Sequence, residues 1–211
     1  DIEFDFNKIV PMPDDLHIVS GSLTDDCYSV YLSSLPIQEA MKDIELYVNS
    51  AMFPEFLRGR QFLKSKEEID KIVKHSIERL QEPDKLDPTR PVFKTKDDVI
   101  AYGKRVSDNL KNYGSKDWYD WCVKNWGTKW NACGTEFDES NPTQIKFDTA
   151  WSDVRMLISK LSEKYPNNLF IYNYAMEETG VYTGVASFKD GKVYDEAEYD
   201  DQSKEAYEQA F

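Results

Sequence analysis

The spacing of hydrophobic residues changes along the chain, and this change constrains the fold more than any other feature. Between residues 36 and 115, apolar side chains recur every three or four positions, as in amphipathic helices. From residue 144 onward they alternate with polar ones, as in half-buried strands. A run of helices followed by a run of strands predicts an α+β fold.

Helices are predicted in the first of these two regions. Pro36 suits a first helical position, and a capping box predicts helix starts after Ser65 and after Thr95. Gly114 is the predicted end of the last of these helices. A short aromatic helix is expected at 118–126. In the first helix the apolar residues Ile37, Met41, Ile44 and Val48 recur at helical spacing.

The last third predicts a strand, a helix and three more strands. Strands are expected at 144–149, 169–175 and 181–188, followed by a tight Asp190-Gly191 hairpin. A helix over 152–164, capped by Ser152, separates the first two strands. This order is the first half of a ferredoxin-like sandwich, so 144–198 should form one antiparallel-dominated sheet with helices on one face. A strand at 2–6 and a terminal helix at 202–210 are also expected.

Four segments resemble a known family. They are "FDFNKIVPMP", "NWGTKWNA", "FDTAWS" and "YPNNLFIYNYAMEETGVYTG", which occur in this order. They resemble the YubB-type ferredoxin-like family, encoded by bacteriophages, prophages and conjugative plasmids and of unknown function. The resemblance implies a ferredoxin-like domain formed by 1–35 and 116–211, with 36–115 as a helical insertion.

The WGTKWNA segment is open to two interpretations. In the structural one, Gly127 ends a helix, Asn131 fixes the loop backbone and Lys129 points outward. Three tryptophans would then pack beneath the sheet: Trp126, Trp130 and Trp151. In the functional one, Lys129 meets an anion and Trp130 stacks on a ring in a pocket. We favour the packed corner and keep these residues as candidate binding residues.

Catalytic and metal-binding patterns are sparse. Glu177 and Glu178 lie at a predicted turn, with Asp148 on a neighbouring strand, and paired carboxylates can bind a cation or transfer protons. At an exposed hairpin they are usually solvated. No P-loop, dinucleotide fingerprint, nucleophile elbow or EF-hand loop occurs. We therefore expect no catalytic residue, metal or cofactor; the alternative is a small-molecule or nucleotide enzyme with a cleft between Trp130 and Glu177.

The net charge of the chain limits the kind of partner that it can bind. Asp and Glu total 39 against 26 Lys and Arg, a net charge of −13. The densest acidic stretch is predicted to form a surface containing Asp195, Glu196, Glu198, Asp200 and Asp201. Such a surface repels phosphate backbones, so tight nucleic-acid binding is not expected. The leading hypothesis is a non-catalytic accessory protein that binds another protein, with the acids as a nucleic-acid mimic in its sharper form.

A second binding hypothesis is an RNA-binding sheet face with Tyr172, Tyr174 and Tyr182 stacking on bases.

The cellular compartment is predicted from other features of the sequence. Three cysteines without C-x-x-C spacing and the lack of an export signal favour a reducing cytoplasm, and the family resemblance implies that it is a bacterial one. No apolar run approaches the roughly 18 residues that span a bilayer, so no membrane association is expected.

Overall fold

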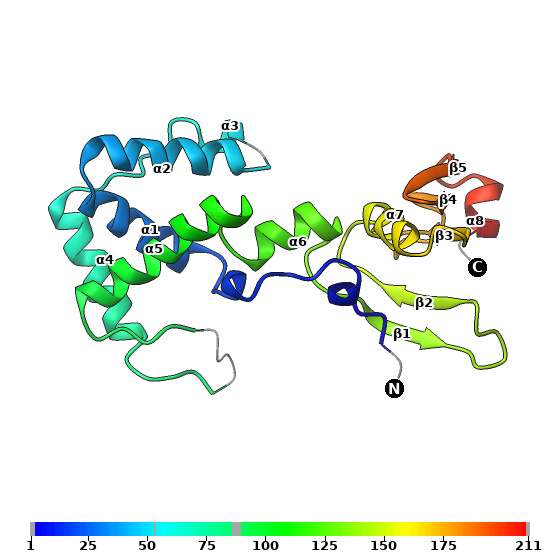
Figure 1. Cartoon of the computed structure of the whole chain (residues 1–211), viewed down its shortest axis with the longest axis horizontal. Helices are drawn as coiled ribbons and strands as arrows, with labels where there is room; N and C mark the ends of the chain where they lie inside the picture. The colour runs from blue at the N-terminus through cyan, green and yellow to red at the C-terminus, as the bar shows by residue number, and fades with distance from the viewer. Residues whose placement is uncertain (1–2, 53, 86–89, 210–211) are drawn as a thin grey trace. The chain divides into compact units, whose positions relative to one another are not determined.

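The fold is α+β, as predicted. The computed structural model describes residues 3–52, 54–85 and 90–209, and combines helices with two antiparallel sheets (Figure 1). The chain divides into two compact units. We call Met12–Trp121 the helical unit, and Asp1–Pro11 with Cys122–Phe211 the C-terminal unit. None of the described helices has the length and apolar character needed to cross a bilayer.

The helical unit is built around α1 and α5, which pack along each other. Its elements are η2 (Asp14–Leu16), α1 (Ser22–Ser34), α2 (Ile37–Ser50), α3 (Pro54–Leu57), α4 (Lys66–Arg79) and α5 (Lys96–Tyr113). The capping boxes that begin α4 at Ser65 and α5 at Thr95 are both present. Gly114 ends α5 in the left-handed conformation, with φ 64°. These helix ends are confirmed.

The helix predicted from the spacing of apolar residues after Pro36 is confirmed as α2, but its apolar residues are not all buried. Its buried residues are Ala40, Asp43 and Tyr47. In contrast, Ile37 is 62% exposed and Met41 is 53% exposed. Ile44 and Val48 are half-buried against the core of the helical unit, so only one side of a wide apolar face meets that core.

The bounds of the units also differ from the predicted domains. Residues 12–35 lie in the helical unit, because α1 buries Tyr28, Val30 and Leu32 in the same core as α5. The division into a domain of 1–35 and 116–211 with 36–115 inserted stays a prediction.

The C-terminal unit contains both sheets. Its elements are η1 (Phe6–Lys8), β1 (Cys133–Phe137), β2 (Ile145–Asp148), α7 (Arg155–Lys164), β3 (Phe170–Tyr174), β4 (Thr183–Lys189), β5 (Lys192–Tyr199) and α8 (Lys204–Gln209). The predicted aromatic helix is α6 (Trp118–Trp126), within which the boundary between the units falls. The terminal helix is confirmed as α8; residue 210 lies outside the described residues.

The single sheet expected over 144–198 is not formed. β2 pairs with β1, a strand that was not predicted, while β3, β4 and β5 form a separate antiparallel sheet. β2 and β3 meet through side chains instead: the Phe147 and Tyr172 rings stack with centroids 6.5 Å apart. The predicted coverage of one sheet face by a helix is confirmed, since α7 packs on β3, β4 and β5.

Three local predictions complete the comparison. The hairpin between β4 and β5 is confirmed, with φ of 51° at Asp190 and 72° at Gly191. α7 begins at Arg155, because Ser152 donates its hydroxyl to the Gly127 carbonyl instead of capping the helix. The N-terminal segment forms η1 in place of a strand; residue 2 of that prediction lies outside the described residues.

Candidate functional site

Part of the WGTKWNA segment is a packed corner of the C-terminal unit. Trp126 is 2% exposed and donates its indole N–H to the Val10 carbonyl at 2.9 Å. Gly127 follows with φ 81° and ends α6. The Asn131 side-chain oxygen accepts from the backbone N–H of Phe6 at 2.8 Å, and its amide donates to Asp5 at 2.8 Å. This part of the corner ties the N-terminal segment to the unit.

Trp130 and Trp151 do not pack beneath a sheet, so this part of the structural interpretation is wrong. Trp130 is 44% exposed and Trp151 is 87% exposed. The interior is filled by Ala150 and Val154, the buried neighbours of Trp151. Lys129 lies between the two indoles, with Nζ 4.3 Å from the Trp130 ring centre and 5.0 Å from that of Trp151. The result is an exposed cation–π cluster in place of a buried corner.

The backbone at Trp151 is unusual. Its φ of 62° is in the left-handed region, where a non-glycine residue is uncommon. Strained backbone tends to occur where function requires a side chain to be held in a particular place. Exposed tryptophans are also frequent among the residues that dominate protein interfaces. The Lys129, Trp130 and Trp151 cluster thus has the composition of a contact surface.

Asp153 and Arg155 form a polar cluster with Tyr182 that the sequence did not reveal. Arg155 donates to both carboxylate oxygens of Asp153, at 3.0 and 3.2 Å, and the Tyr182 hydroxyl donates to Asp153 at 2.6 Å. Burial acts to raise the pKa of Asp153, but these hydrogen bonds outweigh it and the net pKa is lowered. The Asp153 hydrogen bond in turn raises the pKa of Tyr182. The cluster fixes the start of α7 against the sheet.

The three tyrosines of the RNA-binding hypothesis lie in this cluster. The Tyr172 hydroxyl accepts from the Val154 N–H at 3.2 Å, and the Arg155 guanidinium lies 5.0 Å from the Tyr174 ring centre. Burial raises the pKa of Tyr172 to about 12. Since Tyr172 and Tyr174 face α7, they do not form an open platform for bases.

Glu177 and Glu178 are exposed in the turn between β3 and β4. The Glu178 carbonyl accepts from the Val181 N–H at 3.1 Å, which closes the turn. Among the described residues, no group of three or more His, Cys, Asp or Glu side chains is arranged to hold a metal ion. Two cavities formed by described residues lie along α2, and neither is lined by Glu177 or Glu178.

One arrangement in the helical unit has the composition of a catalytic site. Lys111 Nζ lies 2.7 Å from Ser107 Oγ and 2.8 Å from Asp43 Oδ1, and Ser107 donates to the other Asp43 oxygen. A cavity of about 340 Å³ is lined by Asp43 and Lys111. A serine–lysine mechanism requires a neutral lysine as base and a hydroxyl that substrate can reach. Here Lys111 is held in an ion pair with Asp43, and Ser107 is fully buried, so a substrate cannot reach its hydroxyl. The trio therefore ties α2 to α5.

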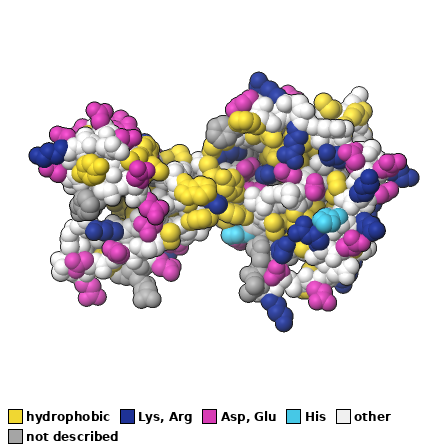
Figure 2. Space-filling view, turned by 180° about the vertical axis from the view of Figure 1, so that it is seen from behind, with side chains coloured by type: hydrophobic (Ala, Val, Ile, Leu, Met, Phe, Trp, Pro, Cys, Tyr) yellow, Lys and Arg dark blue, Asp and Glu magenta, His cyan; other side chains and the backbone are white. Residues whose placement is uncertain are grey.

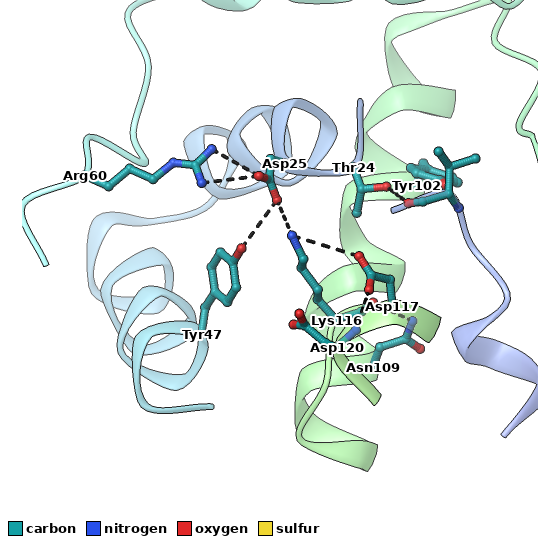
Figure 3. Close-up of polar contacts among 10 residues, drawn as sticks. Thr24, Asp25, Tyr47, Arg60, Tyr102, Asn109, Lys116, Asp117 and Asp120 are labelled. Atoms are coloured by element: carbon teal, nitrogen blue, oxygen red, sulfur yellow. Dashed lines mark hydrogen bonds and ion pairs between the residues drawn. The ribbon is translucent and has the colours of Figure 1, made fainter. Parts of the chain in front are cut away.

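A second charged cluster surrounds Lys116 (Figure 3). Its ammonium lies 2.8 Å from Asp25 Oδ1, 3.9 Å from Asp117 Oδ2 and 5.6 Å from the Tyr47 ring centre. Arg60 pairs with the other oxygen of Asp25 at 3.2 Å. Burial acts to lower the pKa of Lys116, but Tyr47 and Asp25 outweigh it and the pKa is raised. A lysine held protonated in this way serves as a structural charge.

The predicted acidic surface follows one edge of the C-terminal sheet. β5 is an edge strand, and its side chains are exposed along nearly its whole length. We call the five acids on and just after it the acidic edge: Asp195, Glu196, Glu198, Asp200 and Asp201. No ion pair joins any of the five to another described residue, although Asp201 accepts from the Tyr182 N–H at 2.9 Å. Charges on an edge strand also prevent unwanted strand pairing.

The net charge is uneven between the units. The C-terminal unit holds 19 acidic and 10 basic residues, a net charge of −9. The helical unit holds 20 acidic and 16 basic residues, a net charge of −4. On the face in Figure 2, acidic side chains are interspersed with basic ones and do not form one continuous area. The acidic edge thus holds five of the 19 acidic residues of the more acidic unit.

Comparison with known proteins bears on the C-terminal unit alone. Neither the curated proteins nor the solved structures gave a match. The ferredoxin-like assignment is confirmed by a family model, while the YubB-type name stays a prediction. Residues 125–211 match the family described as the ferredoxin-like domain in Api92-like protein, and this part of the chain is similar to that domain.

Proposed function

We propose that this protein is a non-catalytic accessory protein of a bacteriophage or conjugative plasmid, which acts in the bacterial cytoplasm by binding another protein. The observation that carries the proposal is the acidic edge. Its five carboxylates are exposed on and just after an edge strand and make no ion pair with other described residues. They are therefore available to a partner.

The partner that fits this surface is a protein with a cluster of Lys and Arg. Unpaired carboxylates of one sign attract such a surface over several ångströms and raise its association rate. The same field opposes a nucleic acid, which binds by exchanging its counterions for Lys and Arg. In the sharper form of the proposal, the partner's basic cluster is its own nucleic-acid-binding surface, and the acidic edge competes with nucleic acid there.

An affinity-capture comparison tests the proposal. In one variant the five acids of the acidic edge become Asn or Gln. In a matched control, five exposed acids of the helical unit are neutralised: Glu39, Glu55, Glu67, Asp70 and Glu82. At about 50 mM salt the native chain and the control should retain basic proteins from bacterial lysate, and about 200 mM salt should release them. Equal retention by the edge variant would overturn the proposal.

A further inference from the structure

α2 carries an apolar stripe that the rest of the helical unit covers only in part. Ile37 and Met41 are more than half exposed, whereas Ile44 and Val48 are half-buried and also pack against the core of the unit. α2 lies on the outside of the helical unit (Figure 1). Just beyond the helix, Met52 is 48% exposed. A contiguous apolar face of this kind on a helix indicates an interaction surface.

The spacing within the stripe is symmetric. Ile37, Met41, Ile44 and Val48 are separated by four, three and four residues. If a second α2 lies antiparallel to the first, Ile37 faces Val48 and Met41 faces Ile44, and both relations are repeated by the two-fold axis. A two-fold symmetric dimer requires this reciprocity: if a residue of the first copy contacts a different residue of the second copy, the same contact occurs with the copies exchanged. A stripe that is its own complement therefore favours a second copy of the chain over an unrelated helix.

The charges beside the stripe have the same symmetry. Lys42 and Glu45 are exposed on one flank, and neither forms an ion pair with another described residue. A two-fold axis between residues 42 and 43 places this flank beside the same flank of the partner. Lys42 of one copy then lies about 3 Å along the helix axis from Glu45 of the other, within reach of its side chain. The dimer would contain this ion pair twice.

A shallow hollow lies on the same flank. It has a volume of about 380 Å³ and is lined by Met41, Ile44 and Val48 together with Lys42, Glu45 and Asn49. Its lining combines apolar side chains with charged and polar ones, which is the usual composition of a small interface. The side chains of a second α2 would fill it.

We infer that the protein forms a two-fold dimer in which the α2 helices of two copies pack antiparallel through this stripe. The contact is separate from the acidic edge, which is on the C-terminal unit, and it does not depend on the proposed function. Dimerisation would present two acidic edges to a partner, and two linked binding sites raise the apparent affinity without any new contact.

Sedimentation equilibrium of the full chain tests the inference. Protein concentrations of about 1 to 200 µM are suitable, because they resolve micromolar dissociation constants. The native chain should show a concentration-dependent dimer. Met41→Glu should raise the dimer dissociation constant at least about tenfold, because it buries an unpaired charge. Glu39→Gln, which also changes one charge on α2 but away from the stripe, should leave the constant unchanged. Retained helical circular dichroism shows that each variant is folded.

Charge reversal then tests the geometry. Lys42→Glu and Glu45→Lys should each weaken the dimer, and the double variant should restore it, because the two reversed charges again face each other. A chain that stays monomeric at about 200 µM would overturn the inference, even if another protein or the C-terminal unit covers the stripe. A dimer that is insensitive to Met41→Glu, or a double variant that fails to restore association, would overturn it as well.

Discussion

Gly103 of α5 lies so close to Cys27 of α1 that no side chain fits between the two helices. A Cβ added at Gly103 would overlap the Cys27 carbonyl oxygen and lie 2.7 Å from the Tyr31 Cβ. The obstacle is largely backbone, so it cannot move aside as a flexible side chain would. Glycine at this position allows the close approach of α1 and α5 that forms the core of the helical unit.

Gly103→Ala should therefore destabilise the protein by about 3 kcal/mol, although alanine is the better helix former. Chemical denaturation gives the free energy of unfolding. The control is Lys104→Ala, the next residue on α5, which removes only an exposed ion pair to Asp108 and should cost about 0.5 kcal/mol or less. A Gly103→Ala protein as stable as the native one would show that the two helices are farther apart.

Two tryptophans of one segment should differ in their contribution to stability. Trp126→Ala removes a buried ring and its hydrogen bond to Val10, and should cost about 3–5 kcal/mol. Trp130 is 44% exposed, so Trp130→Ala should cost about 1 kcal/mol. Thermal unfolding of the two variants measures the difference. Equal losses would indicate that Trp130 is buried after all.

The cluster around Lys116 predicts a contrast between buried and exposed cations. Lys116→Met leaves Asp25 and Asp117 without their buried counter-charge and should cost about 3–5 kcal/mol. Arg60→Met removes the more exposed partner of Asp25 and should cost about 1 kcal/mol or less. Denaturant midpoints at low and high salt test both values. A larger loss for Arg60→Met than for Lys116→Met would contradict this account of the cluster.

Stability should fall at alkaline pH through Cys27. Burial, reinforced by Asp26, raises the pKa of its thiol from 9.0 to about 12. The unfolded chain releases this proton above pH 9 while the folded chain retains it, so the stabilisation is complete below pH 9 and is lost as the pH rises toward 12. Between pH 8 and pH 10 the native protein should lose about 1.4 kcal/mol more than Cys27→Ala. Parallel pH profiles of the two proteins would refute the assignment.

The sequence predicted those elements whose signals are local. Capping at Ser65 and Thr95, the Gly114 helix end and the Asp190-Gly191 hairpin depend on a few neighbouring residues, and all are confirmed. The alternation in β3 and β4 likewise predicted strands, and the C-terminal family match agrees with the ferredoxin-like assignment.

Features that depend on distant residues were missed. The pattern at 144–149 predicted a strand but not its partner, which is β1 and not β3. The Ile37 and Met41 period indicated a helix without showing which side meets the core. Asp153 and Arg155 carry no motif; only the fold brings Tyr182 to them. The acidic edge was visible in composition, but its exposure on an edge strand required the structure.

The central claim is that the acidic edge binds a basic protein surface and not nucleic acid. Fluorescence anisotropy titrations test it most directly, with a labelled peptide rich in Lys and Arg and with labelled duplex DNA, each at about 150 mM salt. We predict that the peptide binds, that neutralising Asp195, Glu196, Glu198, Asp200 and Asp201 weakens its binding at least about tenfold, and that DNA does not bind below about 10 µM. Submicromolar binding of generic DNA, or peptide binding unchanged by the neutralisation, would contradict the account.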